Sequence, residues 1–265
     1  MAKTTLIPIE MCFDSLKNKK TRTLQVLVWL KMHCSGKIKI TPEVQKKMAN
    51  DIGVKSVKTV KTNINYLQEN QWITRSKRSG YHFIKGFEAI RKMEGFIART
   101  GVEFCISDIK NFKGFLVAAI ITNLISVQKR RLWVTERKKR GSMTVAHKPP
   151  LFYPVANEAL AKILGVSVST AWEWKKLAKR QRFIRIRKEY REIKIEPKFL
   201  PQFKKYIESN NTIIKKGKVF EQLPDKVATN LMLRNRKKLK KSDGKKSKHN
   251  IKGGMGEQRI SEQTK

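Results

Sequence analysis

The sequence predicts a mainly α-helical protein with small β-ribbons, an α+β fold, in which a unit of three helices and a ribbon occurs twice in tandem before a basic tail. Three observations support this prediction. Apolar residues recur at helical spacing in several segments that end at a glycine. Each set of helical segments is followed by a short stretch in which apolar and polar residues alternate. Parts of the two sets also repeat one another at a fixed offset.

The composition favours a polyanionic partner. The chain of 265 residues has 60 Lys and Arg against 21 Asp and Glu, a formal net charge of +39, and such an excess is typical of proteins that bind nucleic acid. Hydrophobic residues make up 40% of the chain, so most of it is expected to fold. An anionic membrane surface is the rival partner. We disfavour it because the longest apolar run, Phe115 to Val127, contains Thr122 and Asn123 and is too short to span a bilayer.

Two features bear on the location of the protein. The first residues, MAKTTLIPIE, lack the apolar stretch and cleavage site of an export signal. The three cysteines, Cys12, Cys34 and Cys105, are scattered and odd in number, which argues against a disulfide framework. Both features predict a cytoplasmic protein.

The duplication is visible in two sets of matching residues. Residues 10–20, EMCFDSLKNKK, match residues 103–113, EFCISDIKNFK, at an offset of 93, and each segment precedes an apolar helical stretch. The second copy contains 19 additional residues, which we place in the basic segment 129–150. That segment is expected to be either a surface loop or an arm that grips phosphates. The second set, at an offset of 112, pairs Ala49 with Ala161, Gly53 with Gly165 and Val54 with Val166.

In the first copy, start and stop signals place three helices and a ribbon. Thr41 is expected to cap a helix that has Pro42 at its first position. The third helix turns Lys58, Thr62 and Asn65 away from its apolar stripe. The predicted elements are helices at residues 23–32, 43–51 and 56–70 and a ribbon that opens at Trp72, bends near residues 77–80 and returns over residues 81–85.

The second copy spans residues 157–195. Ala161 is small where two helices must cross, Gly165 allows a sharp turn, and Ser167 is expected to cap the helix that follows. The buried stripe of this helix is predicted at Val168, Ala171, Trp174 and Ala178. In the ribbon, we expect a bend at Lys188-Glu189-Tyr190, with Ile184, Ile186, Ile193 and Ile195 on one face and Arg185, Arg187 and Lys194 on the other.

The remaining chain is predicted to form an extension and a tail. Pro197 and Pro201 flank a short amphipathic helix, and a hairpin is expected to turn at Lys216-Gly217. From Arg234 onward, basic and small polar residues predict a disordered tail. The predicted domains are residues 1–92, residues 93–196 with the insertion 129–150, an extension at 197–233 and the tail at 234–265.

No arrangement of residues predicts catalysis. The four histidines, His33, His82, His147 and His249, are scattered and lack the paired partners that a metal site needs. No glycine-rich loop ends in Gly-Lys-Ser or Gly-Lys-Thr, and the acids lack the clustering of a two-metal site. We therefore expect a non-enzymatic binding protein without a metal or another cofactor.

The helices and ribbon at residues 157–195, and their counterpart at residues 23–85, resemble the winged helix-turn-helix. In that fold the second helix of the turn enters the DNA major groove and the wing touches the neighbouring backbone. Two such units, a basic tail and no catalytic motif resemble the replication initiators of theta-type plasmids and related mobile elements. In that family one winged domain contacts repeated origin sequences and the other forms a dimer interface or contacts a second half-site. Transcription regulators with the same fold are equally compatible.

The resemblance implies a sequence-specific protein for double-stranded DNA, either a replication initiator or a transcription regulator, and it is compatible with a homodimer. An RNA-binding or nucleic-acid-packaging protein would use the same charge without base contacts. A protein-binding assembly adaptor is a third hypothesis. No small-molecule substrate is evident.

The candidate contacts differ between the two copies. Lys58 suits guanine, Asn65 suits adenine, and Thr62 suits polar base edges or the thymine methyl group. In the second copy Glu173 would either accept a hydrogen bond from cytosine or repel phosphate, and Trp172 is expected in a core or dimer contact rather than on a base. The predicted DNA-binding residues are Lys55, Lys58, Lys61, Thr62, Asn65, Arg75, Lys77, Arg78, Arg137, Lys138, Lys139, Arg140, Ser169, Trp172, Lys176, Lys179, Arg180, Arg185, Arg187 and Lys188.

Overall fold

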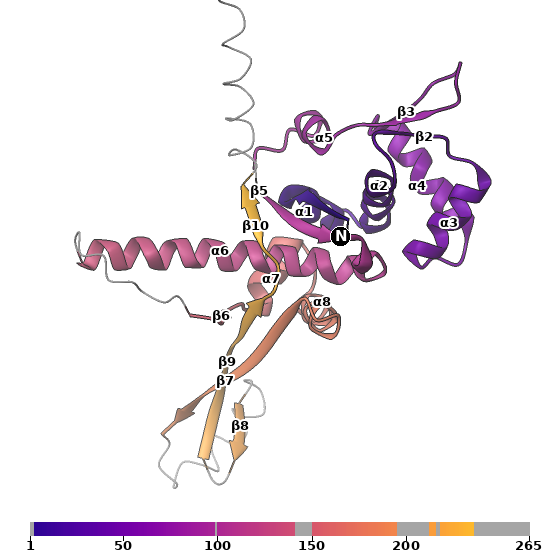
Figure 1. The fold of residues 1–265 in the computed structure, drawn as a ribbon. Helices are drawn as coiled ribbons and strands as arrows, with labels where there is room; N and C mark the ends of the chain where they lie inside the picture. Colours follow the sequence, from indigo (N-terminus) through magenta and orange to yellow (C-terminus); the bar gives the residue numbers. More distant parts are fainter. Residues whose placement is uncertain (1–2, 99, 141–149, 195–211, 216–217, 236–265) are drawn as a thin grey trace, which may run out of the picture.

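A computed structural model describes residues 3–98, 100–140, 150–194, 212–215 and 218–235 of the chain. The fold is mixed α+β with small antiparallel sheets, as the sequence predicts (Figure 1). In chain order the elements are β1 (Thr4–Pro8), α1 (Ile9–Lys17), α2 (Thr21–His33), β2 (Lys37–Ile38), α3 (Pro42–Ile52), α4 (Val57–Glu69), β3 (Ile73–Arg75), β4 (His82–Ile84), α5 (Phe87–Met93), β5 (Thr100–Cys105), η1 (Ile106–Asn111), α6 (Phe112–Arg140), β6 (Tyr153–Pro154), α7 (Asn157–Leu164), α8 (Val168–Arg180), β7 (Ile184–Ile193), β8 (Thr212–Lys215), β9 (Lys218–Thr229) and β10 (Leu233–Asn235).

The first unit runs from α2 to β4. Its strands pair in the order β2-β4-β3, and its turns follow the local signals of the sequence. Thr41 Oγ1 accepts a hydrogen bond from the Val44 N–H at the start of α3. Gly53 ends α3 in the left-handed region with φ +72°, and Ser56 Oγ accepts from the Lys58 N–H at the start of α4. These short-range hydrogen bonds set the turn between α3 and α4.

The second unit runs from α6 to β9 and has the same order of elements and of strands. Its sheet is ordered β6-β9-β7, so that the last strand again lies between the first and the middle one. α8 has 13 residues like α4, and Ser167 caps it as Ser56 caps α4. Two residues after each helix ends, the chain passes through the left-handed region, at Gln71 (φ 56°) after α4 and at Arg182 (φ 64°) after α8. The two helices lie 111 residues apart, because the turn after Gly165 is one residue shorter than the turn after Gly53.

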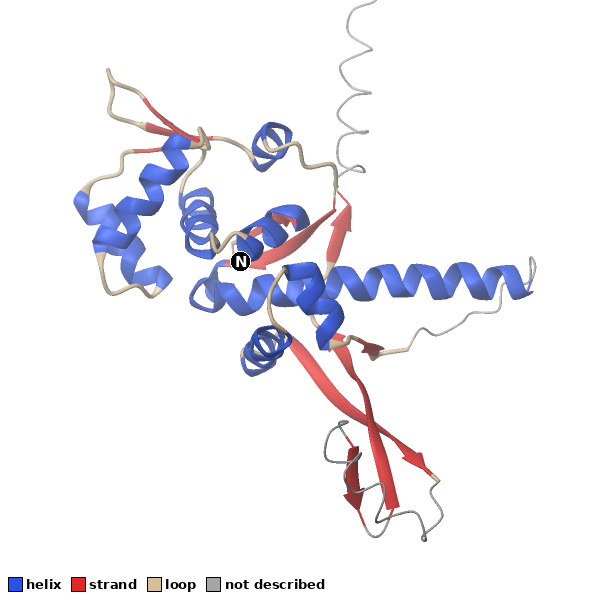
Figure 2. Ribbon diagram, turned by 180° about the vertical axis from the view of Figure 1, so that it is seen from behind, coloured by secondary structure: helices blue, strands red, loops and turns tan. Residues whose placement is uncertain are grey.

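The two units share one hydrophobic core rather than two separate ones. A third sheet, ordered β1-β5-β10, joins the start of the chain to strands from its middle and its end. The N-terminal half of α6 runs through this core, where its residues from Phe115 to Ile121 are buried. Phe104, Phe112, Phe115 and Phe183 stack or meet edge to edge around it. Figures 1 and 2 show the far half of α6 and the second ribbon extending from the body in different directions.

Part of the repeat found in the sequence does not match in structure. Glu10 and Cys12 lie in helix α1, whereas their partners Glu103 and Cys105 lie in strand β5. Only the ends of the two segments are equivalent, because residues 10–20 stop just before core helix α2 and residues 103–113 reach the first two residues of core helix α6. The prediction of one offset for the whole segment was therefore wrong: α1 is a full helix, but η1 is a single short 3-10 helix.

The additional residues of the second copy mostly lengthen a helix. α6 continues to Arg140, so the first part of the segment 129–150 is helical and not a loop; residues 141–149 lie outside the described part of the chain. Among the described residues, one segment, Ile106–Thr135, is long and apolar enough to span a membrane, and 61% of its apolar window is buried inside the protein. Packing within the protein therefore explains its apolar residues.

The second ribbon differs from its prediction. β7 continues from Ile184 to Ile193 through the expected bend, where the pairing shifts between Arg187 and Glu189 as in a β-bulge. Its partner is β9, far along the chain, and the pairs Thr212↔Glu221 and Lys215↔Lys218 form the hairpin predicted around residues 216–217. Strand β9 of the predicted extension 197–233 therefore lies in the same sheet as β7, and β10 pairs with β5 up to Asn235. The amphipathic helix predicted after Pro197 lies outside the described residues.

Candidate nucleic-acid interface

α4 turns a polar strip to solvent. Its stripe of Val60, Ile64 and Leu67 is buried against α2 and α3, which leaves the side chains at positions 58, 62 and 65 exposed. Thr62 Oγ1 donates to the Lys58 carbonyl at 3.0 Å, and the described residues offer no hydrogen-bond partner to the side chains of Lys58 and Asn65. The helix carries no carboxylate before its last residue, Glu69. Charge and hydrogen-bonding groups are therefore available to an anionic ligand along the whole strip.

Beside this strip, α4, α3 and the first ribbon enclose an open groove of about 360 Å³. Lys39, Lys61 and Arg75 line it, together with His82, and no carboxylate does. The His82 side chain is buried, and its Nδ1 has no partner among the described residues. Burial, and secondarily the charge of Arg75, lower the pKa of His82, so the ring is neutral at pH 7. The groove can hold an anion between α4 and the ribbon.

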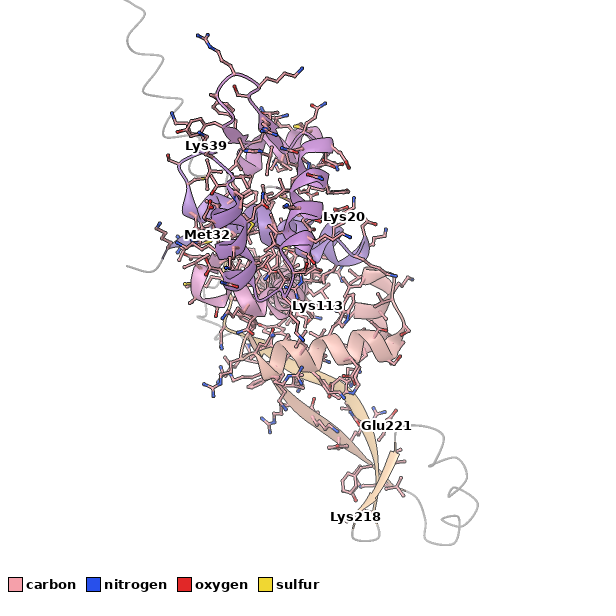
Figure 3. All side chains as sticks on the ribbon, turned by 90° about the vertical axis from the view of Figure 1, so that its right-hand side faces the viewer. Lys20, Met32, Lys39, Lys113, Lys218 and Glu221 are labelled. Carbon is pink, nitrogen blue, oxygen red and sulfur yellow. The ribbon has the colours of Figure 1, made fainter. Side chains whose placement is uncertain are left out.

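The tip of the first ribbon is also basic. The Ser76 N–H donates to the Tyr81 carbonyl at 2.9 Å, and this bond closes the tip. Gly80, with φ +68°, provides the left-handed residue that the turn needs. Lys77 and Arg78 are exposed on the tip, and neither has an ion pair within the described part of the chain. Figure 3 shows the labelled lysines spread along the length of the molecule, from Lys39 through Lys113 to Lys218.

The exposed face of α8 is partly self-neutralised. Glu173 Oε1 lies 2.7 Å from Lys176 Nζ, which also sits 5.2 Å from the centre of the Trp172 ring. Trp172 itself is half-buried, as predicted. Glu173 thus forms an ion pair with Lys176, the lysine that was expected to contact DNA. This role differs from the two considered for Glu173 in the sequence, contact with cytosine and repulsion of phosphate. Further candidates, Ser169, Lys179 and Arg180, are exposed.

The buried stripe of α8 matches its prediction at Ala171 and Ala178, and it differs at Val168, at the half-buried Trp174 and at Lys175. Val168 is 44% exposed, whereas Lys175 is fully buried. Its Nζ donates to the Val155 carbonyl at 2.7 Å, to Asn157 Oδ1 at 3.1 Å and to Asp225 Oδ2 at 3.0 Å. Desolvation lowers the pKa of Lys175, and the hydrogen bond that Lys175 donates to Asp225 opposes that shift. This contact ties α8 to the loop before α7 and to β9.

Sequence reasoning missed Lys175 because it assigned lysines to solvent. Helical phase was the available signal: Lys175 lies four residues after Ala171 and three before Ala178, both fully buried. His82 was missed as well, although it alternates with the buried Ile84 on β4.

The second ribbon is basic near the body and ion-paired farther out. Arg187 and Lys188 are exposed and have no ion pair within the described chain, and Arg185 lies 5.9 Å from the centre of the Phe152 ring. Beyond them, three pairs of opposite charges face each other across the strands. The pairs are Lys226–Glu189 (2.7 Å), Arg191–Glu221 (2.6 Å) and Lys218–Glu192 (2.9 Å).

The structure does not bring all predicted residues together. Lys55, in the turn before α4, is exposed beside the strip on α4. Residues Arg137, Lys138, Lys139 and Arg140 belong to the last turn of α6, but their side chains lie outside the described part of the chain.

The described residues contain no group of three His, Cys, Asp or Glu side chains that could hold a metal ion. His33 has a structural position at the end of α2, where its ring stacks on Trp29 and its Nδ1 lies 2.9 Å from the Trp29 carbonyl. Trp29 in turn donates from Nε1 to Asp51 Oδ2 at 2.9 Å. Cys12, Cys34 and Cys105 are free thiols.

Comparisons with protein-family models, with curated proteins and with solved structures gave no match for this chain. Its function is therefore argued from its own residues.

Proposed function

We propose that this chain is a non-enzymatic, sequence-specific protein for double-stranded DNA, built from two tandem winged helix-turn-helix units. We further propose that it acts in the cytoplasm as a replication initiator or a transcription regulator of a bacterial or mobile-element genome. The observation that carries the proposal is the α4 strip. Its three polar side chains are exposed on the second helix of a capped turn, next to a basic groove and a basic ribbon tip.

This arrangement has the two parts that specific recognition needs. Lys61 and Arg75 in the groove and Lys77 at the ribbon tip supply charge for the backbone phosphates, which fix position but carry little sequence information. Lys58 and Asn65 supply donors and an acceptor that match guanine and adenine edges in the major groove. In the winged helix-turn-helix these two sets lie on the recognition helix and the wing.

The two units are proposed to divide the work. α4 presents unpaired groups, whereas Lys176 on α8 is held by Glu173 and Trp172. The second unit is therefore assigned mainly backbone contacts through Arg180, Arg187 and the basic start of its ribbon, and its half-buried Trp172 is a candidate for contact with a second copy of the chain.

The test is selection of binding sites from random duplexes with the full chain, followed by footprinting. A defined protected site is expected. Lys58→Ala and Asn65→Ala should each lose about 1–3 kcal/mol of discrimination at one base position. Lys92→Ala on α5, also an exposed lysine, is the matched control and should leave the selected sequence unchanged.

Packaging is the second candidate, and the net charge of +39 favours it. Uniform, salt-sensitive protection without a preferred site would support packaging and contradict base contact by α4. Weak affinity for every nucleic acid at low salt would instead point to an adaptor that binds protein.

A further inference from the structure

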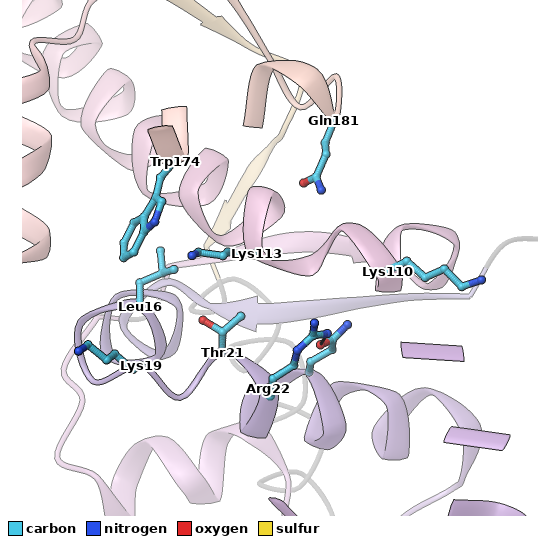
Figure 4. A pocket seen from close by; sticks show the side chains of 9 residues that line it. Leu16, Lys19, Thr21, Arg22, Lys110, Lys113, Trp174 and Gln181 are labelled. Carbon is cyan, nitrogen blue, oxygen red and sulfur yellow. Dashed lines mark hydrogen bonds between the residues drawn. The ribbon is translucent and has the colours of Figure 1, made fainter. Parts of the chain in front are cut away.

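The two units meet at a second basic pocket, distinct from the groove beside α4. It has a volume of about 270 Å³ and lies between the turn from α1 to α2, the start of α6 and the C-terminal half of α8 (Figure 4). Its lining contains four basic side chains and no carboxylate. Lys19, in the turn before α2, and Arg22, in α2, lie on the side of the first unit. Lys110, in η1, and Lys113, in α6, lie on the side of the second unit.

The repeated segments of the sequence supply three of these four charges. Lys17-Asn18-Lys19-Lys20, at the turn from α1 to α2, corresponds to Lys110-Asn111-Phe112-Lys113, at the junction of η1 and α6. Lys19, Lys110 and Lys113 of these segments line the pocket, and Arg22 follows the first segment. Lys19 adopts φ 58°, a left-handed conformation that is unfavourable for residues other than glycine. No side chain caps the start of α2, where Thr21 also lines the pocket. The first N–H groups of α2 therefore add a partial positive charge.

The side of the pocket formed by α6 and α8 holds a charge that no acid neutralises. Lys113 Nζ lies 4.5 Å from the centre of the Trp174 ring, and partial desolvation lowers the pKa of Lys113. Gln181 Oε1 is buried without a partner among the described residues. The side-chain amide of Gln181 lies directly over Gly114, so α6 and the end of α8 approach closely at this side of the pocket. Across the pocket, Arg22 uses only Nη1 within the described chain, on Gln25 Oε1 and the Ile52 carbonyl.

We propose that this pocket binds a phosphate group, and that the group belongs to the backbone of the duplex contacted by α8. Trp174 follows the exposed Glu173, and Gln181 follows the exposed Arg180. Successive residues of a helix are about 100° apart, so the pocket lies next to the face of α8 that is assigned to DNA. A phosphate held there would be gripped by both units at once and would fix the two units on one duplex. The source of the phosphate rests on the proposed function; the phosphate site itself does not.

Titration of the full chain with inorganic phosphate, at constant ionic strength maintained with sodium chloride, tests the site. Trp174 is the reporter, because a bound anion draws the Lys113 ammonium from its ring. A saturable change in tryptophan emission is expected, and Trp174→Phe should abolish it. Because Lys113→Gln also removes the ammonium on which this signal depends, its affinity is measured by isothermal titration calorimetry, where phosphate should bind about tenfold more weakly, the effect of losing one charge-assisted hydrogen bond. Lys110→Gln is a second variant at an exposed position, and Lys92→Gln is the control that should titrate like the unaltered chain.

Salt dependence of DNA binding then identifies the source. If the phosphate belongs to the duplex, Lys113→Gln lowers the slope of log affinity against log salt by about 0.9, the contribution of one phosphate. If Lys113→Gln weakens phosphate binding in calorimetry but leaves DNA binding unchanged, or if phosphate binds the unaltered chain while no DNA does, the pocket serves a free phosphorylated molecule. Superimposable phosphate titrations of the unaltered chain and of Lys113→Gln, or no saturable response in either, overturn the proposal.

Discussion

Lys175→Met removes the charged partner of a buried pair while keeping the length and apolar stem of the side chain. The substitution deletes three hydrogen bonds from Nζ, of 2.7, 3.0 and 3.1 Å, and leaves the Asp225 carboxylate buried, with only 3% of its side chain exposed. Removing one partner of a buried ion pair costs about 3–5 kcal/mol, mostly because the remaining charge is uncompensated. At about 2–4 °C per kcal/mol for a domain of this size, the thermal midpoint should fall by roughly 6–20 °C.

The neighbouring residue provides the control. Lys176→Met also removes an ion-paired lysine from α8, but the side chains of Lys176 and Glu173 are 48% and 65% exposed. Exposed pairs contribute about 0–1 kcal/mol, so this variant should unfold within a few degrees of the unaltered chain. The free energy of unfolding is measured by urea denaturation, followed by circular dichroism and by tryptophan emission.

A double variant separates the charge from the packing. Lys175→Met combined with Asp225→Leu leaves no uncompensated charge, and it should recover much of the stability that Lys175→Met loses. If Lys175→Met proves as stable as Lys176→Met, Lys175 is not buried in solution, and the account of how β9 joins α8 is wrong.

Three further predictions concern other parts of the molecule. Glu173→Gln should free Lys176 and raise DNA affinity at moderate salt by roughly 3- to 10-fold, measured by fluorescence anisotropy; weaker binding would mean that Glu173 contacts a base. The pKa of His82 is lower in the folded chain than its ordinary value of 6.5, so the unfolded chain takes up a proton on His82 at a higher pH than the folded chain does. The free energy of unfolding is therefore unaffected by His82 above pH 6.5, and it decreases as the pH falls from 6.5 through the folded pKa. His82→Gln should flatten that fall in denaturation midpoints measured between pH 7.5 and about pH 5. Gln71→Gly should raise the free energy of unfolding by about 0.5–1 kcal/mol, because Gln71 has φ 56°, whereas Gln68→Gly inside α4 should lower it by about 1 kcal/mol; equal effects of the two glycines would refute the assignment of Gln71 to the left-handed region.

Local signals predicted the centre of each unit. Thr41 and Ser167 cap helices in the structure as the sequence indicates, and Gly53 and Gly165 end the preceding helices in the left-handed region. Ser56 caps α4 as well. Each of these features depends on backbone hydrogen bonds within about four residues, so neighbouring residue types are enough to specify it. The exposed positions of Lys58, Thr62 and Asn65 followed from helical phase for the same reason.

The partner of β7 and the end of α6 were not predicted correctly from the sequence. The second ribbon was expected to turn at residues 188–190, but β7 continues to Ile193 and pairs with β9, which begins after residues 194–217. No residue near Ile193 indicates that it pairs with a strand so far along the chain and not with a strand just before it. α6 was expected to end before Lys129, but a run of basic residues with good helix propensity continues it to Arg140.

The sequence by itself determined the charge of the chain, the succession of capped helices and the duplication of the helical turn, because composition and short-range hydrogen bonds are properties of neighbouring residues. Only the tertiary structure decided that Lys175 lies inside the second unit, that His82 faces a basic groove, and that Lys19 and Lys113 line one pocket. These groups come together through packing of elements distant in the chain. Burial then changes what each group can do, since a lysine beside Asp225 in the interior holds strands and helices together, while a lysine at the surface remains free to meet phosphate.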